Sequence, residues 1–163
     1  NRTDLLIYSK CPKGLTINQK DKYIRRSGLV ADKVFFSQIK YGNLIPFSGK
    51  FQSDIQEVLL VTGIANPLPL VEELKEKYSV ETMIYSDHHN YTAQDIHRIY
   101  KKFDTFATDG KIIITTEKDY ARLMAPEFSK LLSERPWYYQ RMEVEIDRPK
   151  ELIEIIKTYV TKI

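Results

Sequence analysis

The chain of 163 residues has a single cysteine, Cys11, which excludes an internal disulfide and fits a reducing compartment. No apolar run reaches the roughly 18 residues that a membrane-spanning helix needs. No signal peptide is visible. The phosphate-binding loop Gly-x-x-x-x-Gly-Lys-Ser/Thr is absent throughout. The sequence therefore carries neither a disulfide framework nor a complete phosphate-binding fingerprint.

Strong charge is lacking as well. The formal net charge is +3, which permits binding to phosphates or to an anionic membrane surface but does not demand either. No basic stripe interleaves with aromatic residues, so nucleic-acid binding is not predicted. With 42% hydrophobic and 29% charged residues the composition is that of a globular protein, and the length suits one domain or two small lobes.

The chain begins at Asn1 without a methionine and enters an apolar segment almost at once. We therefore expect it to be a piece of a longer protein. Short apolar runs predict buried strands, and capping-box or proline signals predict helices between them. The expected strands are residues 4–8, 33–41, 58–63, 80–85, 111–116 and 137–146, and helices are expected to open near Thr16, Asn66, Thr92, Thr116 and Pro149.

Alternation of strands and helices predicts an α/β fold with a mostly parallel sheet sandwiched by helices, similar to Rossmann-like and P-loop-kinase-like lobes. We expect residues 1–41 to be the tail of an amino-terminal α/β lobe plus a first hinge strand. Residues 42–136 would be the carboxyl-terminal lobe, and residues 137–163 a returning hinge strand and a terminal helix. The segment 42–51, with Pro46 and Gly49, is interpreted as a connector at the boundary.

The most informative stretch is residues 85–91, which follow an expected strand and precede an expected helix. Asp87, His88 and His89 lie here, at the strand end where open α/β sheets gather their chemistry. Such a cluster could hold a metal, position a phosphate, or position or deprotonate a hydroxyl. The alternative is an ordinary polar turn between a strand and a helix.

A second polar cluster, Thr115, Thr116, Glu117 and Lys118, stands where the strand 111–116 gives way to a helix. Two hydroxyls, an ammonium and free backbone amides suit a phosphorylated ligand. The competing interpretation is a helix cap, which Thr116 and Asp119 satisfy by themselves.

Weaker candidates lie at two other strand ends. Lys10 could contact a nucleotide, whereas the neighbouring Cys11 is interpreted as a bystander. Asn66 lies in the turn 62–67, where Gly63 allows either a close backbone approach or merely a turn, and it is a further candidate for substrate or nucleotide contact.

Taken together, several stretches occur in the order and approximate spacing of one family. The chain resembles the carboxyl-terminal portion of the tetraacyldisaccharide 4'-kinase (lipid A 4'-kinase) family over essentially all its length. The matching stretches are DLLIYSKCP (4–12), TGIANP (62–67), SDHHNY (86–91) and TTEKD (115–119), closed by Arg122-Leu123.

The resemblance implies two α/β/α lobes joined by a two-stranded hinge. It implies transfer of the γ-phosphoryl of ATP, with Mg²⁺, to the 4'-hydroxyl of a tetraacylated disaccharide 1-phosphate in lipid A (lipopolysaccharide) biosynthesis. The place of action would be the cytoplasmic side of the inner membrane of a Gram-negative bacterium, with the membrane surface contacted through an amino-terminal part missing here.

In such a kinase a histidine of the Asp-His turn pairs with an aspartate of the amino-terminal lobe at the reacting hydroxyl. The matching residue here is His88, oriented by Asp87, with His89 as second choice. The P-loop lysine, the metal ligands and the partner aspartate of the family are absent from this sequence. We therefore expect the fragment alone to bind no cofactor tightly and to phosphorylate nothing.

Two other interpretations remain open. The Asp-His-His turn also resembles that of the DHH phosphoesterases, which use manganese, but the upstream Asp-x-Asp motif that those enzymes need does not occur. A non-catalytic α/β binding module would account for the strand and helix pattern without any chemistry.

Overall fold

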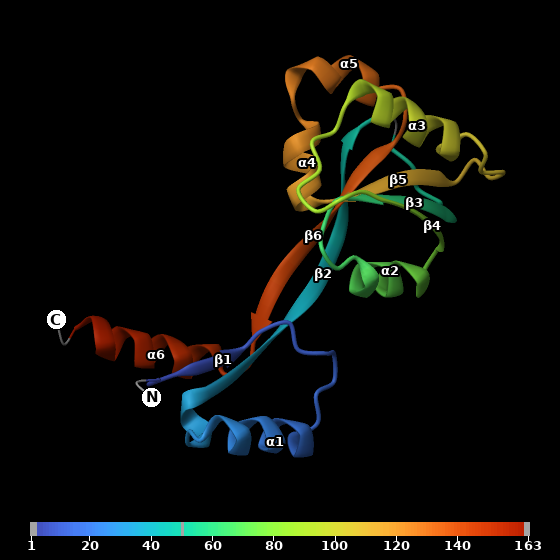
Figure 1. Ribbon diagram of the computed structural model, residues 1–163. Coiled ribbons are helices and arrows are strands. Elements are labelled where there is room, and N and C mark those ends of the chain that lie inside the picture. Colours follow the sequence, from blue (N-terminus) through green and yellow to red (C-terminus); the bar gives the residue numbers. More distant parts are fainter. Residues whose placement is uncertain (1–2, 50, 162–163) are drawn as a thin grey trace. The chain divides into compact units, whose positions relative to one another are not determined.

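The computed structural model describes residues 3–49 and 51–161, and these residues form two compact units (Figure 1). Unit 1 runs to Lys40 and resumes at Met142, and unit 2 is Tyr41–Arg141. The two longest strands, β2 (Val34–Ser48) and β6 (Trp137–Ile146), contribute residues to both units and are neighbours in the strand order. Asp147 faces Phe36 and Glu145 faces Gln38, so the two strands are antiparallel.

The sheet of unit 2 is otherwise parallel. Strand β5 pairs with β6 on one side and with β3 on the other, and β4 follows β3. Helix α2 covers one face of this sheet, and helices α3, α4 and α5 lie on the other (Figure 1). The strands are β3 (Glu57–Thr62), β4 (Ser79–Ile84) and β5 (Lys111–Thr116), and the helices are α2 (Leu68–Lys75), α3 (Ala93–Phe103), α4 (Glu117–Leu123) and α5 (Ser129–Leu132).

The core of unit 2 explains why β3 and β5 carry unbroken apolar runs, residues 58–61 and 112–114. Val58 and Leu60 of β3 pack with the residues of α2, whereas Leu59 and Val61 pack with those of α3. A strand with helices on both faces must bury both sets of side chains, so it reads as a continuous hydrophobic run. This arrangement confirms the predicted α/β class, with a mostly parallel sheet between helices.

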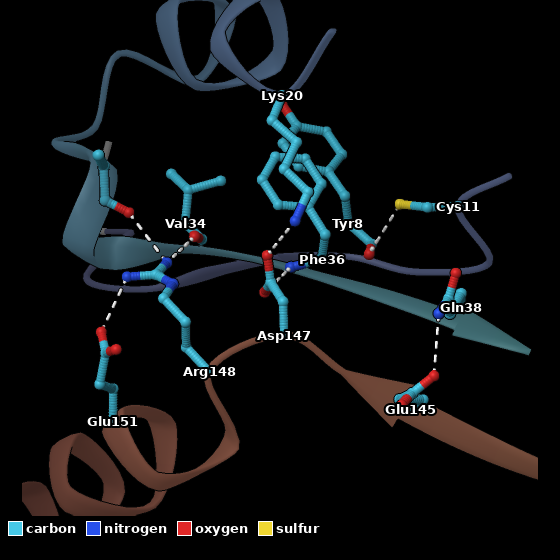
Figure 2. Close-up of polar contacts among 11 residues, drawn as sticks. Tyr8, Cys11, Lys20, Val34, Phe36, Gln38, Glu145, Asp147, Arg148 and Glu151 are labelled. Carbon is cyan, nitrogen blue, oxygen red and sulfur yellow. Dashed lines mark hydrogen bonds and ion pairs between the residues drawn. The ribbon is translucent and has the colours of Figure 1, made fainter. Parts of the chain in front are cut away.

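Unit 1 contains β1 (Leu6–Tyr8), α1 (Ile17–Ser27), a short 3₁₀ helix (Ala31–Lys33) and α6 (Pro149–Val160). Figure 2 shows the polar contacts that join the end of β6 to β2. The carboxylate of Asp147 accepts a hydrogen bond from the backbone N–H of Phe36 at 2.8 Å and from Lys20 Nζ at 2.6 Å. The guanidinium of Arg148 donates to the backbone carbonyl of Val34 at 2.6 Å.

Two expectations about these strands were wrong. The expected connector 42–51 is largely strand, since β2 continues to Ser48, and Lys50 lies outside the described residues. Pro46 lies in the part of β2 beyond its pairing with β1, which ends at residue 36, and proline occurs in strands at such edge positions. The expected burial of residues 4–8 also fails, because Ile7 in β1 is 41% exposed.

The expected helix starts agree well with the structure. Capping boxes are formed at Thr16 and Thr92, and Thr116 accepts the backbone N–H of Asp119. The expected cap at Asn66 is displaced by one residue: Pro67 occupies the cap position of α2, and the side chain of Asn66 accepts from Leu68 N at 3.3 Å. Proline has no side-chain acceptor to offer as a cap, so the side chain of Asn66 accepts the first free backbone N–H of the helix instead.

Candidate active site at the strand ends of unit 2

The polar segments singled out in the sequence converge at one edge of the unit 2 sheet. Residues 85–91 follow β4, Thr62 ends β3 with Gly63 directly after it, and Thr115 and Thr116 end β5. Because β3 is parallel to both β4 and β5, the three carboxyl ends lie at the same edge. Lys10 belongs to unit 1 and is not part of this group.

His88 presents its ring to solvent. Its side chain is 67% exposed, and its backbone takes a left-handed conformation with φ 60°. The backbone N–H of His88 donates to Gly63 O at 3.1 Å and to Asp87 Oδ1 at 3.1 Å, which fixes this uncommon conformation. Asp87 Oδ2 lies 3.7 Å from His88 Nε2, beyond direct hydrogen-bond distance. The backbone of His88 is therefore fixed, while its ring is open to a ligand.

His89 is placed differently. Its ring stacks on Tyr85 with centroids 4.5 Å apart and meets Tyr91 edge-on at 5.0 Å. Its Nε2 lies 3.0 Å from Asp95 Oδ2, and its side chain is only 25% exposed. This packing makes His89 a support for the start of α3, whereas His88 is the histidine that faces outward.

Asp95 closes the capping box of α3 from a nearly buried position. Burial raises the pKa of its carboxyl, but hydrogen bonds from the Thr92 hydroxyl, from His89 and from the Thr92 backbone outweigh burial and bring the pKa below its ordinary value. The Thr92 hydroxyl and backbone N–H donate to Asp95 Oδ2 at 2.8 and 2.9 Å. The turn between β4 and α3 is thus anchored by a carboxylate at its far end.

Asp119 joins the other two strand ends. Its side chain is fully buried, and Oδ2 accepts from Thr62 Oγ1 at 2.8 Å, Gly63 N at 3.0 Å and Thr116 Oγ1 at 2.8 Å. Its other oxygen accepts from Arg122 Nη1 at 3.0 Å. A buried carboxylate is tolerated only when it is paired and hydrogen-bonded in this way.

Gly63 allows the His-containing turn to approach β3. A Cβ atom at this position would lie 2.9 Å from the carbonyl oxygen of Ser86 and 3.2 Å from the Cβ of His89. The first distance is shorter than real Cβ contacts and the second is tight, so the glycine serves close backbone approach. The same residue donates to Asp119 and accepts from His88.

The cluster Thr115 to Lys118 is divided between core and surface. Thr116 and Thr115 are fully buried, and the Thr115 hydroxyl has no hydrogen-bond partner among the described residues. Thr116 is occupied by Asp119, as the helix-cap interpretation expects. Glu117 and Lys118 are exposed in the first turn of α4.

Lys10 and Asn66, the weaker candidates from the sequence, are both exposed. Lys10 is exposed, with φ 56°, and the thiol of Cys11 donates to Tyr8 O at 3.3 Å. Beside Cys11 in unit 1 is a hollow of about 340 Å³, in which Lys20 and Asp147 form their ion pair. Asn66 is exposed and engaged by the backbone of α2.

Sequence reasoning missed the roles of Asp119 and Arg122. Asp119 had been interpreted only as a helix cap, and Arg122 only as the end of a motif. The spacing of three residues on α4 puts both side chains on one face of the helix, and this was the available signal. Burial and then the charge of Asp119 raise the pKa of the phenol of Tyr91, whose ring meets that of His89.

Within residues 3–49 and 51–161, no group of three or more His, Cys, Asp or Glu side chains is arranged to hold a metal ion. Over the same residues, no helix has the length and apolar character needed to cross a bilayer.

The fold and site define an α/β protein that presents the exposed His88, with Arg122 Nη2 at 2.9 Å from its Nδ1, at the carboxyl ends of parallel strands. The family model of tetraacyldisaccharide-1-P 4'-kinase matches residues 1–161, and the chain belongs to this family. The resemblance seen in the sequence motifs is thereby confirmed.

The proteins that this chain is similar to are considerably longer than the chain itself. The tetraacyldisaccharide 4'-kinase of Bacteroides thetaiotaomicron is 33% identical over 164 residues, which cover 90% of this chain and 43% of that protein. The kinase of Phocaeicola vulgatus is 31% identical, covering 99% and 46%. The "apo" form of LpxK from Aquifex aeolicus in complex with ATP is 18% identical, with a TM-score of 0.47, covering 95% of this chain and 52% of that one. The chain thus spans less than half the length of these curated relatives.

Proposed function

We propose that the protein to which this chain belongs transfers the γ-phosphoryl of ATP to the 4'-hydroxyl of a tetraacylated disaccharide 1-phosphate. Family membership supports this reaction, and the exposed ring of His88 at the strand ends is the single observation that carries it. The phosphorylated lipid would enter lipid A, so the protein would work on the cytoplasmic side of an inner membrane.

The residues of this chain would act by alignment. Phosphoryl transfer needs little from a protein beyond positioning the reactants and neutralising charge. His88 would hold the reacting hydroxyl, and Asp87 would orient the ring or the hydroxyl from beside it. The backbone hydrogen bond from His88 to Gly63 fixes the place of the His88 backbone at the strand ends. His89 would act indirectly, by supporting the turn through Asp95.

The described residues include a candidate contact for the phosphates of ATP but no candidate ligand set for Mg²⁺. Lys118 is exposed in the first turn of α4 and offers positive charge to a phosphate at the same edge as His88, while Glu117 and Asp119 of that turn are acidic. For Mg²⁺ no suitable set of carboxylates is gathered in the described residues, so no step is assigned to the metal here. When bound, Mg²⁺ neutralises the phosphate charge; we propose that its ligands and most ATP contacts come from outside this chain.

A kinase assay on the longer protein tests this function. Labelled ATP, Mg²⁺ and the lipid disaccharide 1-phosphate are incubated with wild type, His88→Ala and the matched control His97→Ala, whose histidine is exposed on α3. We expect His88→Ala to lose about 100-fold in turnover and His97→Ala to change little. Equal turnover in all three proteins would favour a non-catalytic module, and manganese-dependent phosphodiester cleavage would favour the phosphoesterase.

A further inference from the structure

Arg122 connects the buried centre of the site to the exposed histidine. Its Nη1 donates to Asp119 Oδ1 at 3.0 Å, and its Nη2 lies 2.9 Å from His88 Nδ1. Asp119 is in turn fixed by both strand ends, since it accepts from Thr62 and Thr116. The orientation of the His88 ring is therefore linked to the fully buried carboxylate of Asp119.

The chemistry of the two partners determines which nitrogen carries the proton. A guanidinium has N–H donors and no acceptor, so the nitrogen of His88 that faces Arg122 must supply a lone pair. That nitrogen is Nδ1. A neutral ring bound to Arg122 therefore carries its proton on Nε2, the nitrogen beside Asp87.

We propose that Arg122 is a positioning residue that fixes both the orientation and the tautomer of His88. In consequence His88 meets its substrate with an N–H at Nε2 and holds an oxygen of the reactants as a hydrogen-bond donor. It does not take up a proton at that nitrogen. The catalytic consequence rests on the proposed kinase function, whereas the tautomer is a property of this chain by itself.

The linkage from Asp119 through Arg122 supports the proposal in two ways. The Arg122 side chain is only 24% exposed, so solvent competes weakly for its donors. Its two nitrogens are used at once by two different acceptors, which a planar guanidinium does well and a lysine ammonium does poorly. Arg122→Lys therefore keeps the charge near Asp119 but loses the second contact.

The tautomer can be read by nuclear magnetic resonance on the 163-residue chain with ¹⁵N-labelled histidine, at about pH 9, where imidazole is neutral. We expect His88 to carry its proton on Nε2, and Arg122→Met to lower the ratio of the Nε2–H to the Nδ1–H form by about tenfold, about 1.4 kcal/mol. His97 serves as internal reference, and Arg26→Met on α1 is the matched control.

Three outcomes would overturn the proposal. They are a proton on Nδ1 of His88 in the wild type, an unchanged ratio in Arg122→Met, or an equal change in Arg26→Met. Arg122→Lys guards against a folding defect, because it retains a cation for Asp119 and should still shift the ratio while amide spectra remain native.

Steady-state kinetics of the longer protein distinguish a failure of the proposed kinase function from a failure of the positioning role of Arg122. We expect Arg122→Lys to lower kcat by about tenfold with little change in the KM for ATP, since it disturbs alignment and not nucleotide binding. If the tautomer responds to Arg122 but His88→Ala retains full turnover, the proposed function fails while the positioning role stands. If His88→Ala is inactive but neither the tautomer nor kcat responds to Arg122, the positioning role fails alone.

Discussion

Replacing Asp119 with alanine should be the most damaging single change at the strand ends. The substitution removes the acceptor of the Gly63 N–H and of the Thr62 hydroxyl, both buried. Each buried donor left without a partner costs about 1–3 kcal/mol. The half-paired Arg122 adds less, because its side chain still reaches solvent. We therefore expect a loss of about 4 kcal/mol, in the range for a broken buried charge network.

The assay is urea unfolding followed by the fluorescence of Trp137, which is the single tryptophan and is fully buried in unit 2. The matched control is Asp104→Ala, which removes an equally well-formed pair with Arg135, at 2.9 Å. Asp104 is 49% exposed on its side chain, so the control should lose less than about 1 kcal/mol. If Asp119→Ala loses no more than Asp104→Ala, the network does not stabilise the site as argued.

Further predictions concern the same unit. Gly63→Ala should cost about 1–3 kcal/mol because the added methyl overlaps a backbone carbonyl, whereas Gly42→Ala, whose Cβ would meet nothing closer than 3.6 Å, should be neutral or stabilising in the same urea assay. Tyr100→Phe should cost about 1–3 kcal/mol of stability, because Trp137 Nε1 loses its hydrogen-bond acceptor at 3.1 Å. In the wild type, absorbance titration should show that burial raises the pKa of Tyr100 to about 12. The pKa of Asp95 is lower in the folded protein than in the unfolded chain, so the contribution of this carboxylate to stability is complete above about pH 4 and is lost as the pH falls through the folded pKa. Asp95→Asn should lack this part of the pH dependence of unfolding. An acid unfolding profile identical to that of the wild type would contradict the assignment.

The fold was largely predictable because its signals are local. Continuous apolar runs marked β3 and β5, and hydroxyl residues spaced three before Gln19 and Asp95 marked the starts of α1 and α3. The error at residues 42–48 arose because proline reads as a loop signal, whereas its tolerance depends on which strand lies alongside. That pairing is decided by residues far away in the chain.

The site was predictable only in part. Position after a strand pointed to the segment around His88, and parallel pairing brought it to the edge that holds Thr116. The difference between His88 and His89 was not visible, since adjacent residues in a turn can face either way. The hydrogen bond between Arg122 and His88 was not visible either, since it joins residues that are 34 apart in sequence.

The central claim, that His88 is aligned with a sugar hydroxyl receiving phosphate, is tested most directly by a single-turnover experiment. The longer protein is loaded with the lipid acceptor, mixed with ATP and Mg²⁺, and the rate of product formation is followed for wild type and His88→Ala. The account predicts a chemical step about 100-fold slower with lipid affinity preserved. An unchanged rate in His88→Ala would contradict it.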